Sequence, residues 1–385
     1  MTPGDGSRVL VLNTGSSSIK YRLFDGSATV AKGLIERIGE PGGDAPDHRG
    51  ALQRVMDELD LTGLVAVGHR VVHGGPEFSA ATVIDDEVVA RIEALVPLAP
   101  LHNPPALAGI AVARKLLPDV PQIAVFDTAF HATIPPEGVT WAIDAGLAAR
   151  WQIRRYGFHG TSHAYVARRT AEVLGRSPAE TNVITLHLGN GASACAVQGG
   201  RSVATSMGMS PQGGLVMGTR SGDIDPTVVF HLHRVAGLPI GEIETSLIRH
   251  AGLRGLTGEN DLRQILRRRS AGDEAAALAF AVYCRRIREY VGAYLAVLGR
   301  VDAITFTAGV GENSAEVRAA SLAGLDALGI AVDPDRNQNA EQVISPDGMP
   351  ITVCVVPTDE ELEIAEQARG IADSGRTGPV RGIHP

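Results

Sequence analysis

Residues 9–25 read VLVLNTGSSSIKYRLFD, and this stretch decides how the chain begins to fold. Apolar and β-branched residues stand on both sides of a turn that holds one glycine and three serines. Such runs predict two strands joined as a hairpin. Gly15 lets backbone N–H groups approach an anion, Ser16 and Ser18 offer hydroxyl donors, and the turn is followed by the positive charge of Lys20. The turn is typical of a phosphate site, although a solvated hairpin has the same composition.

A second stretch, VITLHLGNGASACAVQGG at 183–200, repeats this plan of strand, small-residue turn and strand. The repeat favours a chain of two similar halves, each with a glycine-containing hairpin. Gly189, Gly191 and Ala194 also fit the spacing of a dinucleotide fingerprint. That motif needs a helix after the glycines, however, and here a strand is predicted. A hairpin that cradles phosphate is the better functional interpretation.

Strand-like and helical segments alternate along the rest of the chain, which indicates an α/β architecture. TAGVGENS at 307–314 is predicted as a strand that enters a glycine loop and then a helix, whose N-terminus could hold a nucleotide. Two capping boxes mark predicted helix starts, one from Asn313 to Glu316 and one from Thr358 to Glu361. Residues 63–75 are predicted as a strand that runs into a glycine-rich turn, and 122–127 and 302–309 as strands. The predicted helices are 104–118, 273–299 and 313–325.

Composition excludes several classes of protein. The 385 residues carry a formal net charge of −8, which argues against a nucleic-acid-binding surface. The three cysteines are far apart, so neither a zinc ribbon nor a disulfide framework is expected. The N-terminus lacks the features of a secretory signal and no long apolar run occurs, so we expect a soluble cytoplasmic protein without a membrane span.

Charged residues beside glycines or at strand ends are the candidates for chemistry. Arg70, in GHRVVHGG, and Arg220, in MGTRSGDIDP, could each bind a carboxylate or phosphate through a bidentate fork. His159, in YGFHGTSH, could donate to developing charge, but a structural histidine is about as common. Asp127 ends a predicted strand, where active-site residues of α/β proteins gather. Glu360 becomes a metal-ligand candidate if Mg²⁺ takes part.

Together these motifs resemble the acetate kinase family, within the superfamily of sugar kinases, actin and ATP-dependent heat-shock chaperones. The resemblance spans residues 9–365 in the family's order. The matching stretches are VLVLNTGSSSIKYRLF, GHRVVHGG, PLAPLHNPP, FDTAFHATIP, RRYGFHGTSH, HLGNGAS, MGTRSGDIDP, FTAGVGENS and PTDEELEIA. This chain departs from the usual pattern at Leu262, where the family commonly has Phe, and at Ala132, where Gln is common.

The resemblance implies two similar actin-like, ribonuclease H-like domains with mixed sheets, 1–148 plus 362–385 and 149–361, with a nucleotide in the cleft between them. It implies reversible phosphoryl transfer between ATP and acetate, giving ADP and acetyl phosphate, with Mg²⁺ or substituting Mn²⁺ as cofactor. It also implies a homodimer, with no nucleic acid or membrane as partner.

The site residues that the resemblance implies fall into four groups. The catalytic residues are Asp127, His159 and Arg220. The substrate is bound by Arg70 and an apolar pocket of Val72, Leu101, Phe158 and Pro211. Metal is held by Asn13 and Glu360. ATP is bound by Lys20, His187, Leu188, Gly189, Asn190, Gly191, Asp261, Leu262, Arg263, Gly309, Val310, Gly311, Glu312 and Asn313.

A carboxylate acceptor is already ionised, so the reaction needs no general base. We therefore interpret Asp127 as a ligand of Mg²⁺-bound water or as an orienter of an arginine. Three alternatives stay open at this stage: a propionate or butyrate kinase, which would share every charged residue; an ATPase module without an acyl substrate; and a sugar kinase, which would need a polar pocket and a base.

Overall fold

The computed structural model describes residues 7–376, which divide into two compact units. Unit 1 consists of the chain up to Ala132 together with the segment from Asp359 onward, and unit 2 is Thr133–Thr358. The domain boundaries expected from the sequence, 148/149 and 361/362, stay predictions. Residues 1–6 and 377–385, assigned above to the first domain, lie outside the described residues.

Unit 1 is built on a six-stranded mixed sheet with the order β3-β2-β1-β4-β6-β5. The first three strands form an antiparallel meander, and β4 then runs parallel to β1 and β6 parallel to β4. The strands are β1 Arg8–Thr14, β2 Ile19–Asp25, β3 Ala28–Ile35, β4 Leu64–Val71, β5 Thr82–Val83 and β6 Gln122–Phe126.

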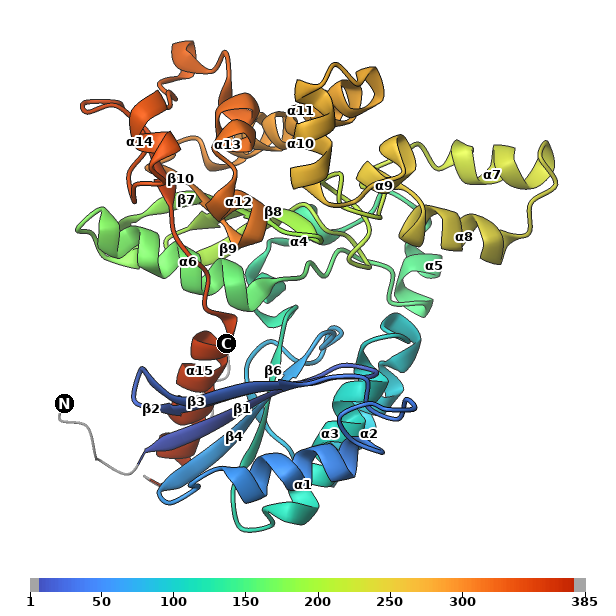
Figure 1. Ribbon diagram of the computed structural model, residues 1–385, viewed down its shortest axis with the longest axis vertical. Coiled ribbons are helices and arrows are strands. Elements are labelled where there is room, and N and C mark those ends of the chain that lie inside the picture. Colours follow the sequence, from blue (N-terminus) through green and yellow to red (C-terminus); the bar gives the residue numbers. More distant parts are fainter. Residues whose placement is uncertain (1–6, 377–385) are drawn as a thin grey trace. The chain divides into compact units, whose positions relative to one another are not determined.

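Helices bury both faces of this sheet (Figure 1). Leu10 and Leu12 of β1 belong to a cluster with α1 and α3, whereas Val9 and Val11 belong to a cluster with α15. Two buried faces explain why the first strand is apolar at successive positions and not at alternate ones. The helices are α1 His48–Glu58, α2 Asp86–Ala94, α3 Asn103–Leu116 and α15 Glu360–Arg376, with 3₁₀ turns η1 Val96–Leu98 and η2 Ala129–Thr133.

A glycine sets the distance between β4 and α15. A Cβ added at Gly68 would lie 2.9 Å from Cγ2 of Ile364. Such a distance is too short for two carbon atoms, so only glycine lets the helix close onto the strand here. This contact fixes the start of α15 near the end of β4, where Arg70 is located.

Unit 2 repeats the strand order of unit 1. Its five-stranded sheet has the order β11-β10-β7-β8-β9, with an antiparallel β7-β8-β9 meander and with β10 and β11 parallel to β7. The strands are β7 Asn182–Leu188, β8 Ala192–Gln198, β9 Arg201–Thr205, β10 Ala303–Thr307 and β11 Thr352–Val355. The predicted α/β fold with two similar halves is therefore confirmed.

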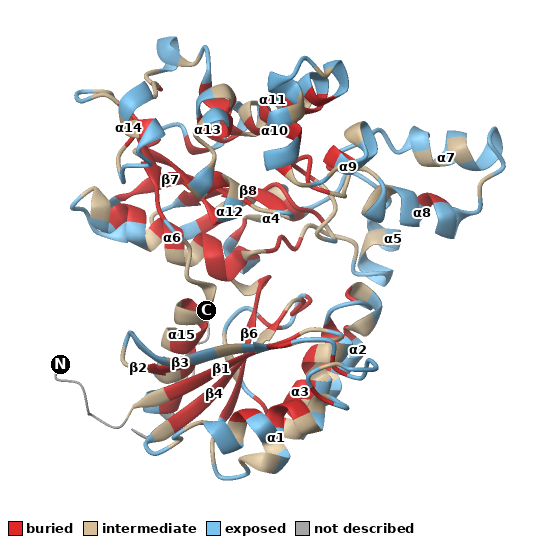
Figure 2. Ribbon diagram, in the orientation of Figure 1, coloured by how far each residue is buried: buried red, intermediate tan, exposed pale blue. Residues whose placement is uncertain are grey.

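Helices also cover the sheet of unit 2, in which α6 contacts β7 and β10 and α11 contacts β7 and β8. Figure 2 shows the central strands of both sheets buried, the edge strand β3 of unit 1 largely exposed, and the outer helical surfaces exposed. The helices are α4 Pro136–Val139, α5 Ala145–Arg150, α6 Gly160–Val173, α7 Thr227–Arg234, α8 Ile240–Arg249, α9 Gly252–Thr257, α10 Leu262–Ser270, α11 Glu274–Leu298, α12 Ala308–Asn313, α13 Ala315–Leu322 and α14 Pro334–Gln338, with 3₁₀ turns η3 Pro178–Glu180 and η4 Asp326–Leu328.

Three local predictions were wrong. The glycines after β10 do not form a loop, because residues 308–313 are themselves the helix α12. The N-cap of α13 is Ser314 and not Asn313, whose amide instead donates to the Gly309 carbonyl. The start of α15 is capped by Asp359, whose carboxylate accepts from the Leu362 N–H, because the Thr358 hydroxyl is bonded to Ser162.

Within residues 7–376, none of the helices combines the length and the apolar character needed to cross a bilayer. The three cysteines are buried as free thiols.

Candidate functional site

An ionic group lies at the carboxyl ends of β4 and β6 in unit 1. Arg70, near the end of β4, donates from Nε to Oδ1 of Asp127 at 3.0 Å and from Nη2 to Oδ2 at 2.8 Å. Asp127 directly follows β6 and is almost fully buried. Nη2 of Arg70 also lies 3.3 Å from Glu360 at the start of α15. Parallel strands end at one edge of a sheet, which is why these distant residues meet.

Burial and charge act against each other in this group. Burial raises the pKa of the Asp127 carboxyl, although Arg70 opposes the shift, and Glu360 adds to the rise. Burial alone would lower the pKa of Arg70, but Asp127 and Glu360 together raise it. Two carboxylates around one guanidinium leave a surplus negative charge, which favours binding of a cation.

This donor set fits Mg²⁺. Magnesium is usually bound by one or two carboxylates together with substrate phosphates and water. Asp127 and Glu360 provide such a pair. Among residues 7–376, no three His, Cys, Asp or Glu side chains are grouped so that they could hold a metal ion unaided.

The first hairpin lies on the same sheet. The turn between β1 and β2 is closed by the Gly15 N–H, which donates to the Ser18 carbonyl at 2.8 Å. Asn13 and Lys20 are opposite each other on the two strands. Nζ of Lys20 lies 2.5 Å from Glu361, and more than half of the lysine side chain is exposed. Lys20 is therefore within reach of an incoming anion.

In unit 2, His159, Arg220 and the turn between β7 and β8 converge. A Cβ added at Gly191 would lie 3.3 Å from Nη2 of Arg220 and 3.5 Å from Nε2 of His159. The ring of His159 stacks on that of His187, with 4.2 Å between centroids. The turn is closed by the Gly189 N–H, which donates to the Gly191 carbonyl. Glycine thus leaves a small space bordered by an imidazole and a guanidinium.

His159 holds an unusual backbone conformation. It directly precedes α6 and has a φ of 57°, in the left-handed region that non-glycine residues rarely occupy. Such strain costs about 1–3 kcal/mol and persists where the surroundings over-determine the conformation, commonly at functional sites. The side chain of His159 is fixed by its contacts with Ser193 and His187.

Arg220 is anchored to its own loop. Its Nη1 donates to the carbonyl of Pro211, and burial lowers its pKa. Two residues predicted for the apolar pocket lie in unit 2. Pro211 is beside Arg220 because its carbonyl accepts from that arginine, and Phe158 directly precedes His159 in the chain. The other two lie in unit 1, where Val72 is half-buried and Leu101 is exposed.

A pocket of about 590 Å³ in unit 2 contains most of the residues predicted for ATP. The predicted residues that line it are Gly189, Asn190, Asp261, Leu262, Arg263, Gly309, Val310 and Asn313. The sequence did not indicate Leu253, Asn260, Leu266 or Tyr283, which also line it. Its volume is within the range of small-molecule sites.

Three of the residues predicted for ATP also have structural roles within unit 2. Gly311 is buried in α12. The carboxylate of Glu312 accepts from the N–H groups of Ala308 and Thr358, so it joins the start of α12 to the segment before α15. Asp261 is the N-cap of α10 and pairs with Arg263. Their roles in nucleotide binding stay predictions.

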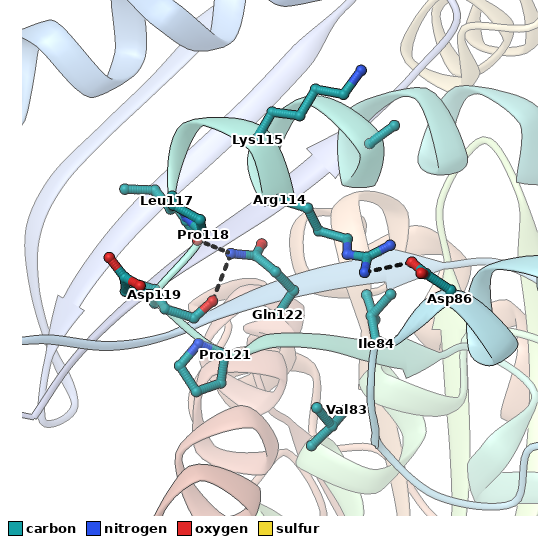
Figure 3. Close-up of a pocket in the computed structure, with 12 residues that line it drawn as sticks. Val83, Ile84, Asp86, Arg114, Lys115, Leu117, Pro118, Asp119, Pro121 and Gln122 are labelled. Carbon is teal, nitrogen blue, oxygen red and sulfur yellow. Dashed lines mark hydrogen bonds and ion pairs between the residues drawn. The ribbon is translucent and has the colours of Figure 1, made fainter.

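Another pocket lies in unit 1, at the start of β6 and therefore at the opposite end of that strand from Asp127. Figure 3 shows that several of its polar side chains are paired within the pocket. Arg114 donates to Asp86, and the amide of Gln122 donates to the carbonyls of Leu117 and Val120. None of the predicted site residues lines it.

Comparison with known proteins identifies relatives along nearly the whole chain. Residues 8–366 match the sequence pattern of the acetokinase family. The acetate kinase of Streptomyces griseus is 57% identical, with 97% of both chains covered. That of Clavibacter michiganensis is 55% identical, with 94% of this chain and 98% of the relative covered.

Solved structures agree with these relatives. The crystal structure of Porphyromonas gingivalis acetate kinase has a TM-score of 0.90 at 41% identity and covers 95% of this chain and 99% of its own. A propionate kinase from Francisella tularensis has a TM-score of 0.90 at 38% identity, with 94% of this chain and 99% of its own covered.

Proposed function

This chain belongs to the acetokinase family and transfers a phosphoryl group between ATP and acetate; we propose that it does so by direct in-line attack of the carboxylate on the γ-phosphorus. A carboxylate oxygen forms the new bond to phosphorus while the bond to the β–γ bridging oxygen breaks. ADP and acetyl phosphate are the products, and no proton has to move. The reverse reaction makes ATP from acetyl phosphate.

The observation that carries this mechanism is the ionic group of Arg70, Asp127 and Glu360. Arg70 positions the acetate carboxylate through its positive charge and its remaining N–H donors, since charge-assisted hydrogen bonds to a carboxylate are strong. Asp127 is already bound to Arg70 through both of its oxygens, which supports its role as an orienter of that arginine. A carboxylate acceptor gives Asp127 no proton to remove.

His159 and Arg220 act on the transferring phosphoryl group. In phosphoryl transfer the charge is spread over three equatorial oxygens, and catalysis depends on positioned donors. The space at Gly191 between His159 and Arg220 supports this assignment. The pocket lined by Asp261, Leu262 and Val310 receives the nucleoside.

Mg²⁺ would be held by Glu360 and Asn13, with Asp127 contacting a metal-bound water. When bound, the ion neutralises charge on the phosphate oxygens. The surplus negative charge beside Arg70 supports this placement. Mn²⁺, which also prefers oxygen ligands, could substitute for it. The proposal places the reaction in the cytoplasm.

A hydroxamate assay tests the function. Purified protein is incubated with ATP, Mg²⁺ and hydroxylamine, with acetate, propionate, butyrate or glycerol in parallel. We expect acetyl hydroxamate to form fastest. A faster reaction with propionate would keep the chemistry and change the substrate, because one methylene is worth only about 1–3 kcal/mol. ADP release without any hydroxamate would overturn the proposal.

The proposal includes a homodimer that uses α7 and α8. Val228 and Phe230 on α7 and Ile240 on α8 are exposed, and α7 has no buried residue. An exposed apolar helix of this kind favours a protein partner. We expect light scattering to give twice the chain mass and Phe230→Asp to shift the protein toward monomer. Leu278→Asp, at an exposed apolar position on α11, is the matched control; a monomeric wild type would contradict the assignment.

A further inference from the structure

A chain of hydrogen bonds leads from His159 into the interior of unit 2. Nδ1 of His159 lies 2.9 Å from Oγ of Ser193, which lies 2.7 Å from Nε2 of His163. Nδ1 of His163 lies 2.7 Å from Oγ1 of Thr185. Ser193, His163 and Thr185 are fully buried. The chain connects the residue before α6 to α6 itself and to strands β7 and β8 (Figure 1).

The single proton of Ser193 makes this chain directional. A neutral imidazole has one donor nitrogen and one acceptor nitrogen. Since Ser193 can give its proton to only one of its two histidines, the other must donate N–H to the serine oxygen. The chain therefore has two polarities when both rings are neutral, and each polarity fixes the tautomers of His159 and His163 together.

Only one polarity leaves His159 able to act on a phosphoryl oxygen. If Thr185 donates to His163, then Nε2–H of His163 donates to Ser193, and Ser193 donates to Nδ1 of His159. His159 then carries its proton on Nε2, the atom that borders the space at Gly191. In the reverse polarity Nε2 holds a lone pair, which would repel the phosphoryl oxygen. Arg220 already supplies the positive charge there, so the site needs a donor from His159.

We propose that Ser193 and His163 are positioning residues that hold His159 as the neutral Nε2–H tautomer. Which ring nitrogen carries the proton is set by the hydrogen bond that the other nitrogen makes. The strained backbone of His159 and its stacking on His187 fix the direction of the ring, and Ser193 fixes its proton. This inference rests on the proposed role of His159 in phosphoryl transfer.

Variants of His163 separate this role from packing. A glutamine can place an amide N–H near the position of Nε2 and still donate to Ser193, whereas the shorter asparagine reaches only toward the Nδ1 position. We expect Ser193→Ala and His163→Asn to lower kcat about 10-fold, because the tautomer of His159 is no longer held. His163→Gln should keep most of the activity, and none of these variants should change the KM for ATP or acetate more than about twofold.

Thr170→Val is the matched control. Thr170 is a fully buried residue of α6 whose hydroxyl bonds to the Val166 carbonyl and to Thr305, away from His159. We expect its kcat to equal that of the wild type. Thermal melts of all variants show whether each one folds.

The tautomer is measured directly by nitrogen-15 NMR of histidine-labelled wild-type protein, with the His159 signals assigned from a His159→Gln sample. We expect the Nε2–H form. The Nδ1–H form or an imidazolium would overturn the proposal, as would a wild-type kcat in folded Ser193→Ala. Absence of acyl hydroxamate with the wild type would reject the proposed function instead, and the NMR result would still decide the tautomer.

Discussion

The two units share a strand order but hold opposite kinds of side chains at their sites. In unit 1 the carboxyl ends of β4 and β6 hold Arg70 and Asp127, and Glu360 completes an ionic group. In unit 2, His159 is supported by neutral hydroxyls and imidazoles, with Arg220 as the neighbouring cation. In the proposed mechanism, one scaffold thus serves two tasks: holding charged ligands and presenting donors to a group that changes charge.

We expect the largest effect from removal of Arg70, the cation of the ionic group in unit 1. Arg70→Ala should lower kcat/KM for acetate by about 10²–10³, because a positioned donor to the reacting anion is lost. The hydroxamate assay measures this effect.

Arg22→Ala is the control for that change. Arg22 has the same exposed side-chain fraction as Arg70, 22%, and pairs with Asp359 in the same unit. We expect it to stay within a few-fold of the wild type. Equal losses in both variants would mean that Arg70 acts through stability alone.

Unit 1 also contains a buried histidine, His69 on β4, whose burial leads to a prediction about the pH dependence of stability. Burial lowers the pKa of His69 to about 4, and its Nε2 contacts Oε1 of Gln122 at 2.8 Å. Between that value and the ordinary 6.5, the unfolded state binds more protons than the folded state. The free energy of unfolding should therefore fall as pH drops through this window, by about 3 kcal/mol.

Urea unfolding of the wild type and His69→Gln at several pH values measures this contribution, because the other titrating groups cancel in the difference. The variant should show the shallower pH dependence. Parallel curves would mean that folding does not lower the pKa of His69.

Filling the small space in unit 2 tests whether reacting groups occupy it. Gly191→Ala would place a methyl group beside Arg220 and His159, and we expect kcat to fall roughly 10–100-fold through displacement of the phosphoryl group. Gly292→Ala on α11, where no heavy atom lies within 4 Å of the added Cβ, is the control and should keep full activity. An unchanged kcat for Gly191→Ala would remove this space from the site.

The smallest expected effect concerns backbone strain at the end of β10. Ala308 has a φ of 64°, a conformation that costs an L-residue about 1–2 kcal/mol and that glycine adopts without strain. Part of this stabilisation is lost in the glycine variant, because glycine raises the conformational entropy of the unfolded state. Ala308→Gly should raise the free energy of unfolding by about 0.5 kcal/mol. Calorimetry detects the change in Tm, and a lower Tm would show that the alanine methyl contributes more through packing.

Local patterns predicted many of the elements well. Both hairpins, the strand before Asp127 and the long helix at 273–299 were confirmed, because periodicity and glycine turns act within a few residues. The caps predicted at Asn313 and Thr358 were wrong: the Asn313 amide donates back to Gly309 within α12, and Thr358 has a partner far away in the sequence. The Thr358 hydroxyl binds Ser162, which leaves Asp359 to cap α15.

The site was predicted less completely. The charged residues stood out beside glycines and at strand ends. Ser193 and His163 did not, although His163 lies four residues after His159 in HGTSH, a spacing that could have indicated a partner. Their contact depends on α6 lying against the sheet, and Tyr283 reaches its pocket from another helix.

The sequence alone determined the α/β class, the two similar halves and the charged residue types, since strand propensity, turn chemistry and charge are properties of short segments. Only the tertiary structure decided which of those charges meet. Asp127 and Glu360 reach Arg70 because β4 and β6 end at the same edge of the sheet and α15 begins there. Ser193 and His163 are buried where α6 packs on the sheet, and buried polar groups must find partners within the protein. They therefore bond to each other, and Ser193 also bonds to His159.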